Sequence, residues 1–276
     1  MTLSRLGSKR WGSFRAVLLV QMEAISLMTF KPDSFAGLRT RLWLREHVNP
    51  LLERGSRLLS PTAWLQGREI VFQGIVHREL ERLGIVDLPL YPLRSAATYS
   101  YLYLLLRAVQ ELPDLRILEL GAGQSTRLLD RLRDSFGLEL TTLEHDQGWQ
   151  ESVQGQVETQ VLTASLIDRR LRGHACDGYD PGVLAEGSRF NVLLVDGPRS
   201  SRKRSRWGCL EFMENWLEDE FLIVFDDAER RGELQTIAAA LQLLDEKGVR
   251  YRSNLVRSVN SQFLIATPGF TAALHF

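Results

Sequence analysis

The sequence has only two cysteines, Cys176 and Cys209, in 276 residues. Because they lack the close pairing of a zinc knuckle or a redox motif, they exclude a disulfide framework and are typical of a reducing compartment. The five histidines never fall at the helical spacing of metal ligands, so we expect no histidine-based metal site. The formal net charge is zero, since 34 Lys and Arg balance 34 Asp and Glu. The overall charge of the chain therefore does not attract it to nucleic acid or to a lipid surface.

A long apolar run is also missing. The run "AVLLV" follows several cationic residues, as in a signal peptide, but Gln21 and Glu23 interrupt it and no small-residue cleavage site follows. No stretch reaches the roughly 18 apolar residues that a membrane span needs. The sequence therefore predicts a cytoplasmic protein without a transmembrane segment.

Residues 1–94 are predicted to form a helical N-terminal extension. Apolar residues recur near helical spacing between residues 35 and 59, and a second helix is expected from about Gln66 to Leu83, ending near Gly84. Residues 1–60 carry ten Lys or Arg against four Asp or Glu, a surplus of six. Basic amphipathic helices can touch an anionic membrane, bind a partner, form a homodimer or cap a pocket, although more often they pack on their own domain with a solvated face.

After Pro113, apolar strands alternate with amphipathic or polar segments. The expected strands are "LRILEL", "LELTTLE", "ETQVLTA", "FNVLLV" and "EFLIVF", and the segment "SAATYSYLYLLLRAVQEL" before them is expected to be a helix. Continuous apolar runs suit strands that are buried on both faces, so the pattern predicts an α/β fold with a doubly wound, mostly parallel sheet. The last two strands, in "VRYRSNLVRS" and "SQFLIATP", are too close in sequence for a crossover helix and should form an antiparallel hairpin.

Two glycines, Gly121 and Gly123, stand in "LELGAGQST", where the first strand turns into its helix. Ligands bind at this edge of an open parallel sheet, and missing side chains let a ligand approach the backbone. A dinucleotide site would place a third glycine where Thr126 stands. Glu119 would repel a pyrophosphate but suits a cation or an amino group. The pattern predicts a nucleoside-like ligand that is not a diphosphate.

A second acidic position follows in "TTLEHD". Glu144 lies 21 residues beyond Gly123, close to the roughly 20 residues at which a carboxylate holds ribose hydroxyls. Asp146 is the alternative ribose ligand. His145 or Trp149 could flank an adenine, and for Trp149 a place in the core is an equal alternative.

With these motifs the chain resembles the class I, or Rossmann-like, S-adenosylmethionine-dependent methyltransferases. "LELGAGQST" is similar to their first motif, "LEHDQGW" to their second-strand acidic motif and "FNVLLVDGPR" to their fourth-strand motif. The resemblance covers about residues 95–267 and implies a class I methyltransferase-like domain over 95–276, with a seven-stranded sheet whose last strand is antiparallel. "VDGP" and "FDDAER" are also similar to a group that contains glucuronoxylan O-methyltransferase-like proteins.

The resemblance implies S-adenosylmethionine as the cofactor. It implies that Glu119, Gly121 and Gly123 line the methionine end and the ribose of the cofactor, and that Glu144 holds the ribose hydroxyls. It also implies that Ser125 and Thr126 donate to the cofactor carboxylate. For Ser125 and Thr126, capping of the following helix is the structural alternative. Arg94 and Ser95, just before the preceding helix, are further candidates to reach the cofactor.

Three aspartates are expected to meet at the reactive end. Asp196 ends the fourth strand, and Asp226 and Asp227 end the fifth in "LIVFDDAER". Clustered carboxylates raise one another's pKa, so one must be protonated or act as a base, or a cation must lie between them. Asp196 is the first candidate for the catalytic base, with Asp227 or Asp226 second. Metal-dependent small-molecule O-methyltransferases carry acids at these strand ends, so the resemblance also suggests all three as ligands of a divalent cation such as Mg²⁺. For Asp227 the alternative is a helix cap.

Five of the eight residues from Arg199 to Arg206 are cationic. The run follows directly on the fourth strand and would overhang the acceptor pocket. Arg199 and Arg202 are therefore candidate contacts for a carboxylate, phosphate or sulfate group, with a solvated loop as the plainer interpretation. Nucleic acid is not expected, because no aromatic residue interleaves with the charges until Trp207.

Together these features predict an S-adenosylmethionine-dependent methyltransferase that modifies an oxygen of an anionic or carbohydrate-like small-molecule or glycan acceptor. One alternative is a nicotinamide-dependent oxidoreductase, against which Thr126 and the antiparallel end of the sheet argue. Another is a methyltransferase-like module that binds a partner through its N-terminal helices and has little catalysis.

Overall fold

The structure, a computed structural model, describes residues 61–90, 97–199 and 203–274. The chain divides into two compact units, Met1–Trp64 and Leu65–Phe276. The predictions for residues 1–60, and those for Arg94 and Ser95, lie outside the described residues. Among the described helices, none combines the length and the apolar character that crossing a bilayer requires.

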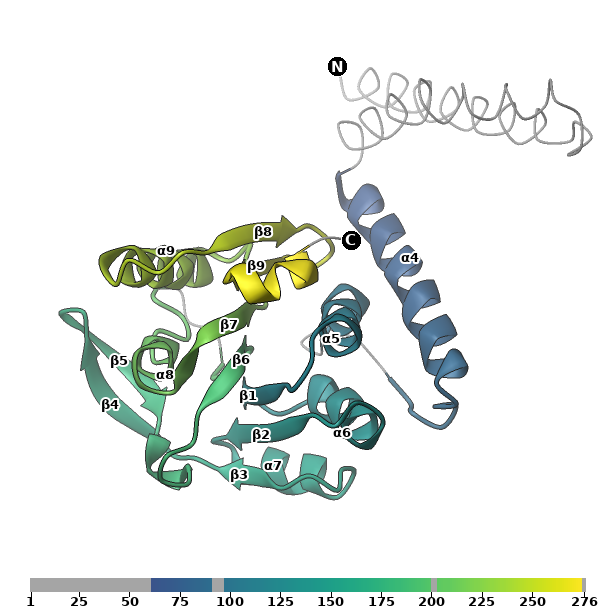
Figure 1. Cartoon of the computed structure of the whole chain (residues 1–276), viewed down its shortest axis with the longest axis horizontal. Helices are drawn as coiled ribbons and strands as arrows, with labels where there is room; N and C mark the ends of the chain where they lie inside the picture. The colour runs from purple at the N-terminus through teal and green to yellow at the C-terminus, as the bar shows by residue number, and fades with distance from the viewer. Residues whose placement is uncertain (1–60, 91–96, 200–202, 275–276) are drawn as a thin grey trace, which may run out of the picture. The chain divides into compact units, whose positions relative to one another are not determined.

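A seven-stranded sheet lies at the centre of the second unit (Figure 1). Its strands, in spatial order, are β3 (Val161–Thr163), β2 (Glu139–Glu144), β1 (Arg116–Leu120), β6 (Phe190–Val195), β7 (Leu217–Phe225), β9 (Gln262–Ala266) and β8 (Arg252–Val256). The first five are parallel, and β9 runs antiparallel to both β7 and β8. This arrangement confirms the predicted fold class, including the antiparallel last strand and the final hairpin.

Helices cover both faces of the sheet, because successive residues of each buried strand point to opposite sides. Ile117 packs toward α5 (Tyr99–Glu111), α6 (Gln124–Phe136) and the 3-10 helix η4 (Pro268–Leu274), whereas Leu118 packs toward α8 (Cys209–Asn215) and α9 (Arg231–Glu246). The short helix α7 (Gln147–Gln154) connects β2 to β3. The sheet is thus doubly wound, as predicted.

Helix α4 (Pro61–Arg82) packs on α5 as part of the same core. Phe72 is buried with its ring centroid 5.2 Å from that of Tyr103, and the α4 residues Val76 and Leu80 are also buried. The expected end near Gly84 is confirmed, since this glycine has a φ of +74° just after the helix. The compact unit therefore begins at Leu65, ahead of the predicted boundary at residue 95.

A two-stranded hairpin, β4 (Leu166–Leu171) and β5 (His174–Tyr179), was not predicted. It stands in the crossover from β3 to β6, where a helix is usual. Its turn is Arg172–Gly173, with φ of +50° and +77°. Tight hairpin turns favour Asn-Gly or Asp-Gly, so an arginine at the first turn position gave no recognisable signal.

Candidate functional site

The turn after β1 brings two backbones into contact. Gly121 has a φ of +98°, and a Cβ there would lie 2.8 Å from the backbone nitrogen of Gly197 and 2.9 Å from its Cα. The Gly197 N–H donates to the Leu120 carbonyl at 2.5 Å, which holds the ends of β1 and β6 together. Gly123, by contrast, has open space where a Cβ would be. Only the first glycine is therefore required by the fold, and the second leaves space for a ligand.

Glu119 is buried beneath this turn. Its Oε2 accepts hydrogen bonds from the hydroxyls of Thr126 (2.7 Å) and Thr142 (2.8 Å). Burial raises the pKa of Glu119 to about 7, although the hydroxyls of Ser125, Thr126 and Thr142 oppose the rise. The Thr126 oxygen also accepts the Gly123 N–H at 2.8 Å. In the structure Thr126 caps the following helix, which is the structural alternative, and its hydroxyl proton is directed at Glu119; its contact with a cofactor carboxylate stays a prediction.

Glu144 lies at the end of the neighbouring strand and orders the loop around it. Its Oε2 accepts from the Ala122 N–H at 3.1 Å, and its Oε1 accepts from the N–H groups of His145 (2.7 Å) and Asp146 (2.9 Å). The Asp146 carboxylate caps α7 through the Trp149 N–H at 2.9 Å, so Asp146 is engaged in the helix cap. Glu144 is thereby placed beside the glycine turn, as its spacing predicts.

Trp149 does not belong to the core. Half of it is exposed (51%), and its Nε1 donates to the Ala122 carbonyl at 2.7 Å, which fixes the ring beside the glycine turn. His145 lies on the same loop, with its ring edge-on to Tyr179 at a centroid distance of 5.9 Å. An exposed indole held next to an open backbone offers a flat surface for a planar base.

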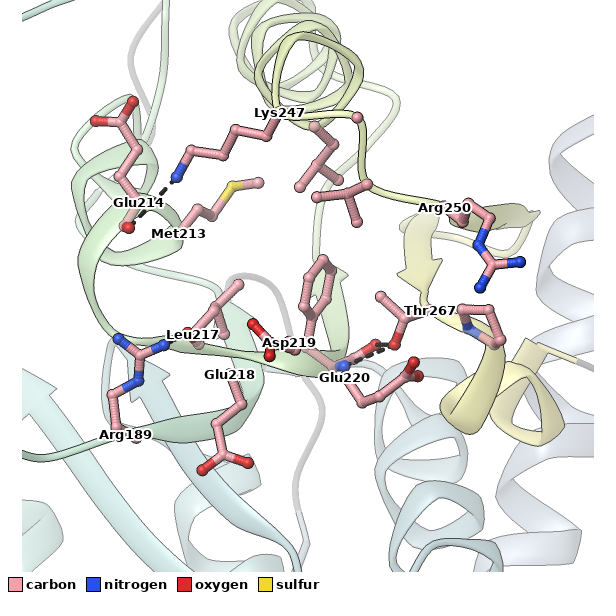
Figure 2. Close-up of a pocket in the computed structure, with 15 residues that line it drawn as sticks. Arg189, Met213, Glu214, Leu217, Glu218, Asp219, Glu220, Lys247, Arg250 and Thr267 are labelled. Carbon is pink, nitrogen blue, oxygen red and sulfur yellow. Dashed lines mark hydrogen bonds between the residues drawn. The ribbon is translucent and has the colours of Figure 1, made fainter.

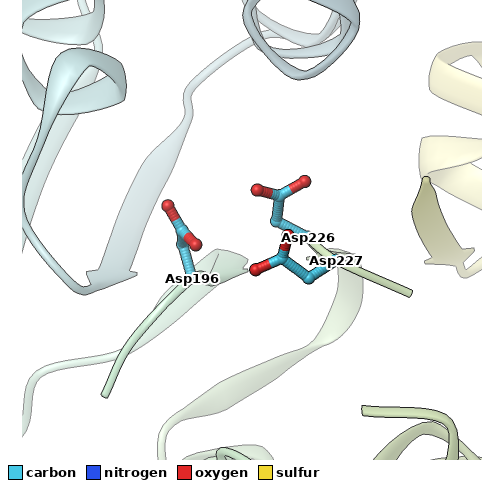
Figure 3. A group of neighbouring side chains, drawn as sticks. All are labelled: Asp196, Asp226 and Asp227. Carbon is cyan, nitrogen blue, oxygen red and sulfur yellow. The ribbon is translucent and has the colours of Figure 1, made fainter. Parts of the chain in front are cut away.

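The three predicted aspartates meet at the ends of β6 and β7. Carboxylate oxygens of Asp196, Asp226 and Asp227 all lie within 4.8 Å of one another, and Figure 3 shows the side chains converging on one space. Asp227 adopts a left-handed backbone (φ +59°), which is rare for a residue with a side chain and typical of functional sites. Asp196 is the most accessible of the three, with 24% of its side chain exposed against 5% for Asp227.

A buried cation lies among these carboxylates. The Arg206 Nη2 donates to Asp196 Oδ1 at 3.0 Å and to Asp227 Oδ2 at 2.8 Å, and its Nη1 donates to the Asp226 carbonyl at 3.0 Å. Arg230 reaches Asp227 from the exposed side at 2.7 Å. A cation between the acids is one of the alternatives that the sequence leaves open, but Arg206 stands out in the sequence only as a member of the charge run. No pattern in that run marks the one arginine that turns inward.

Burial is the main influence on the pKa values of Asp196 and Asp226. It raises the pKa of Asp196 to about 7, while Arg206 lowers it and Asp227 raises it further. It also raises the pKa of Asp226 well above its usual range, with the charges of Asp196 and Asp227 adding to the rise. The Gln262 amide donates to Asp226 at 2.8 Å. Burial and the two neighbouring carboxylates thus favour the protonated form of Asp226, and Asp196 changes charge near neutral pH.

Two buried tyrosine hydroxyls, those of Tyr101 and Tyr179, have no hydrogen-bond partner in the described part of the chain. Burial raises the pKa of both, and in each case Asp196 and Glu119 are among the charges that raise it further. The Tyr179 hydroxyl lies beside the strand end that carries Asp196, since a Cβ on Gly197 would be 2.3 Å from it. Buried polar groups without partners are rare and point to a ligand or water at this place. Sequence reasoning missed both tyrosines, since Tyr101 lies in an apolar helix and looks like core, and Tyr179 ends a hairpin strand that was not predicted.

The predicted substrate contacts are placed only in part. Arg199 is exposed beyond the end of β6, and Arg202 lies outside the described residues. A hollow of about 340 Å³ lies elsewhere, around the first residues of β7 and the end of α9 (Figure 2). It is lined by Arg189, Glu218, Asp219, Glu220 and Lys247 among others, and contains none of the predicted site residues.

Comparisons with known proteins add the following. No protein-family model matches the chain, and no curated protein matches it. Among solved structures, a methyltransferase from Pyrococcus furiosus has a TM-score of 0.44 and 13% identity, covering 73% of this chain and 97% of its own. An O-methyltransferase from Bacillus cereus in complex with SAH has a TM-score of 0.42 and 13% identity, covering 71% and 91%. A precorrin-6Y C5,15-methyltransferase from Geobacter metallireducens has a TM-score of 0.43 and 13% identity, covering 63% of this chain and 92% of its own. Likeness at this level assigns no activity to this chain.

Proposed function

We propose that this chain is an S-adenosylmethionine-dependent methyltransferase that methylates an oxygen of an anionic or carbohydrate-like acceptor. The proposal is carried by the carboxyl edge of β1, where Gly121 has no room for a side chain and two buried acids, Glu119 and Glu144, flank the turn. Thr126 stands where a dinucleotide site needs a third glycine and is locked to Glu119. A pyrophosphate would face both acids, whereas the sulfonium and amino groups of S-adenosylmethionine would be attracted by them.

The residues around this edge fit such a ligand. Gly123 leaves its backbone uncovered, and Trp149 offers an exposed ring for the adenine. Glu144 Oε1 faces the N–H groups of His145 and Asp146 and the His145 Nδ1 at 2.8 Å, whereas Oε2 accepts from the Ala122 N–H, so Oε2 has an acceptor site for a ribose hydroxyl. The buried hydroxyls of Tyr101 and Tyr179 would gain partners on binding.

S-adenosylmethionine, if held at this edge, would supply a sulfonium methyl group. The acceptor oxygen would bond to the methyl carbon as the carbon–sulfur bond breaks, the neutral thioether S-adenosylhomocysteine would be the leaving group, and the proton of the acceptor would pass to a base of the chain. Asp196 is the base that takes the acceptor proton, because it is the accessible member of the cluster and its pKa of about 7 suits proton transfer at neutral pH. Asp227 is less suited, since Arg206, Arg230 and Asn260 already occupy its oxygens.

The acceptor class follows from the charges beyond β6. Arg199 is exposed three residues after Asp196 and would attract a carboxylate, phosphate or sulfate on the acceptor, with Arg202 as its predicted companion. A hydroxyl on such a molecule is a weak nucleophile, which is why a base beside it is needed.

Isothermal titration of the full chain with S-adenosylmethionine, S-adenosylhomocysteine and NAD tests the cofactor. We expect the first two to bind and NAD not to bind; NAD binding alone would make the chain an oxidoreductase. Turnover is then measured as S-adenosylhomocysteine release with uronic acids, sugar phosphates and sugar sulfates. Asp196→Asn should abolish turnover but retain cofactor binding, while the exposed Asp219→Asn is the matched control. Binding without turnover on any acceptor would favour the binding-module alternative.

A further inference from the structure

Arg206 occupies the interior of the acidic cluster as a metal ion would. Its side chain is 5% exposed, and one nitrogen, Nη2, contacts both Asp196 and Asp227. The other donors are used on backbone oxygens, Nη1 on the Asp226 carbonyl and Nε on the Pro198 carbonyl at 3.4 Å. A guanidinium presents five donors in a fixed plane, so one side chain can satisfy acceptors from several directions.

The loop that carries Arg206 is built to hold it inward. Arg206 has a left-handed φ of +58°, which costs conformational energy for any residue with a side chain. The preceding residue is tied down twice: the Ser205 hydroxyl donates to Glu233 at 2.8 Å, and the Ser205 carbonyl accepts from the Thr236 hydroxyl at 2.6 Å. The guanidinium is thus fixed by α9 and does not move with an exposed loop.

Guanidinium groups already accompany the carboxylates of the cluster. Arg206 contacts Asp196 and Asp227, with Glu233 3.9 Å from its Nε, and Arg230 contacts Asp227. A hard divalent ion needs about six oxygen ligands at 2.0–2.6 Å. It would have to take oxygens that Arg206 holds and stand within a few ångströms of a buried positive charge, which is strongly unfavourable at low dielectric.

We propose that the Arg206 guanidinium is the built-in cation of this acidic cluster: it stands where a divalent ion would need to bind, makes the site independent of metal, and holds the Asp196 carboxylate in place. The first two parts stand on the geometry alone. The third rests on the proposed methyl transfer, in which Arg206 is a positioning residue acting through Asp196.

Binding of Mn²⁺, followed by electron paramagnetic resonance and calorimetry on the full chain, tests the proposal. Wild-type protein should show no saturable Mn²⁺ binding, whereas Arg206→Met should gain one ion per chain, together with an Mn²⁺-dependent rise in melting temperature. Asp227→Asn added to Arg206→Met should remove that gain. The matched control is Arg204→Met, since this nearby arginine lies over the Trp207 ring at 6.0 Å from its centroid and should behave as wild type.

Saturable Mn²⁺ binding by the wild type that Asp196→Asn removes would overturn the proposal, as would a folded Arg206→Met variant that gains no ion. If Arg206→Met does not fold, the wild-type titration still tests the proposal, because saturable Mn²⁺ binding that Asp196→Asn removes would contradict it. Titration of S-adenosylhomocysteine on the same samples distinguishes the two proposals. Absence of S-adenosylhomocysteine binding would contradict the proposed function, while the Mn²⁺ result would still test whether Arg206 takes the place of a metal ion.

Discussion

The two glycines of the turn after β1 should respond in opposite ways to the same substitution. In Gly121→Ala, the left-handed backbone alone costs about 1–2 kcal/mol for a residue with a Cβ. The new methyl would lie 2.8–2.9 Å from Gly197 backbone atoms, so the ends of β1 and β6 must separate and the hydrogen bond at the Leu120 carbonyl, worth about 1 kcal/mol, is lost. We expect a loss of about 3 kcal/mol in the free energy of unfolding, or a fall of about 6–12 °C in melting temperature.

In Gly123→Ala the new methyl meets no atom within 4 Å and the backbone is extended. As a helix N-cap, alanine is somewhat worse than glycine, so the loss should stay below about 1 kcal/mol. The methyl would nevertheless occupy the open space assigned to the ligand, so S-adenosylhomocysteine affinity should fall at least about tenfold, equivalent to roughly 1.4 kcal/mol.

Urea unfolding followed by circular dichroism and calorimetric titration of S-adenosylhomocysteine measure both effects on the same proteins. Equal stability of the two variants would refute the close approach of β1 and β6. Unchanged affinity in Gly123→Ala would refute the assignment of the ligand to this turn.

Three further predictions concern single side chains. The rate of methyl transfer should rise with pH through about 7, because Asp196 must lose its proton to act as a base; a flat profile between pH 6 and 8 would contradict that role. Burial raises the pKa of Glu119 from an ordinary 4.5 to about 7, so its contribution to stability is present below pH 4.5 and is lost as the pH rises through about 7. Glu119→Gln should therefore be more stable than wild type at pH 8, by about 1–3 kcal/mol, and equal to it near pH 4; thermal denaturation at both pH values checks this. Trp149→Ala should leave unfolding nearly unchanged because the ring is half exposed, yet weaken S-adenosylhomocysteine binding, with Trp149→Phe intermediate; equal affinity in all three proteins would remove Trp149 from the site.

Much of the sheet could be predicted because its strands are continuous apolar runs. "FNVLLV" and "LIVF" are buried on both faces, and such runs have few other stable environments in a globular protein. The β4–β5 hairpin could not be predicted in the same way. Its strands alternate weakly between buried and exposed residues, and its tight turn is made by Arg172 in a left-handed conformation that arginine seldom adopts.

The acids of the site could be located because strand ends of a parallel sheet share one edge. Asp196 and Asp226 follow β6 and β7 directly, so their meeting is a property of the topology. Arg206 could not be located, because its sequence neighbours are equally cationic and its burial depends on Ser205 and Thr236, which meet only in the folded chain. Hydrophobic periodicity predicts which residues of a helix or strand are buried. The burial of a single charged side chain depends instead on contacts between residues that are distant in sequence.

The packing of α4 sets how far the chain can be shortened. Three side chains on one side of that helix, Phe72, Val76 and Leu80, are buried in the core that α5 shares. Burying them stabilises the folded state by about 4–8 kcal/mol, comparable to the whole net stability of a typical domain. A polypeptide starting at residue 95, where the motifs begin, would expose the apolar surface of α5 that α4 covers, and it should aggregate. The smallest fragment that folds on its own must therefore include α4, although the predicted site residues all lie beyond it.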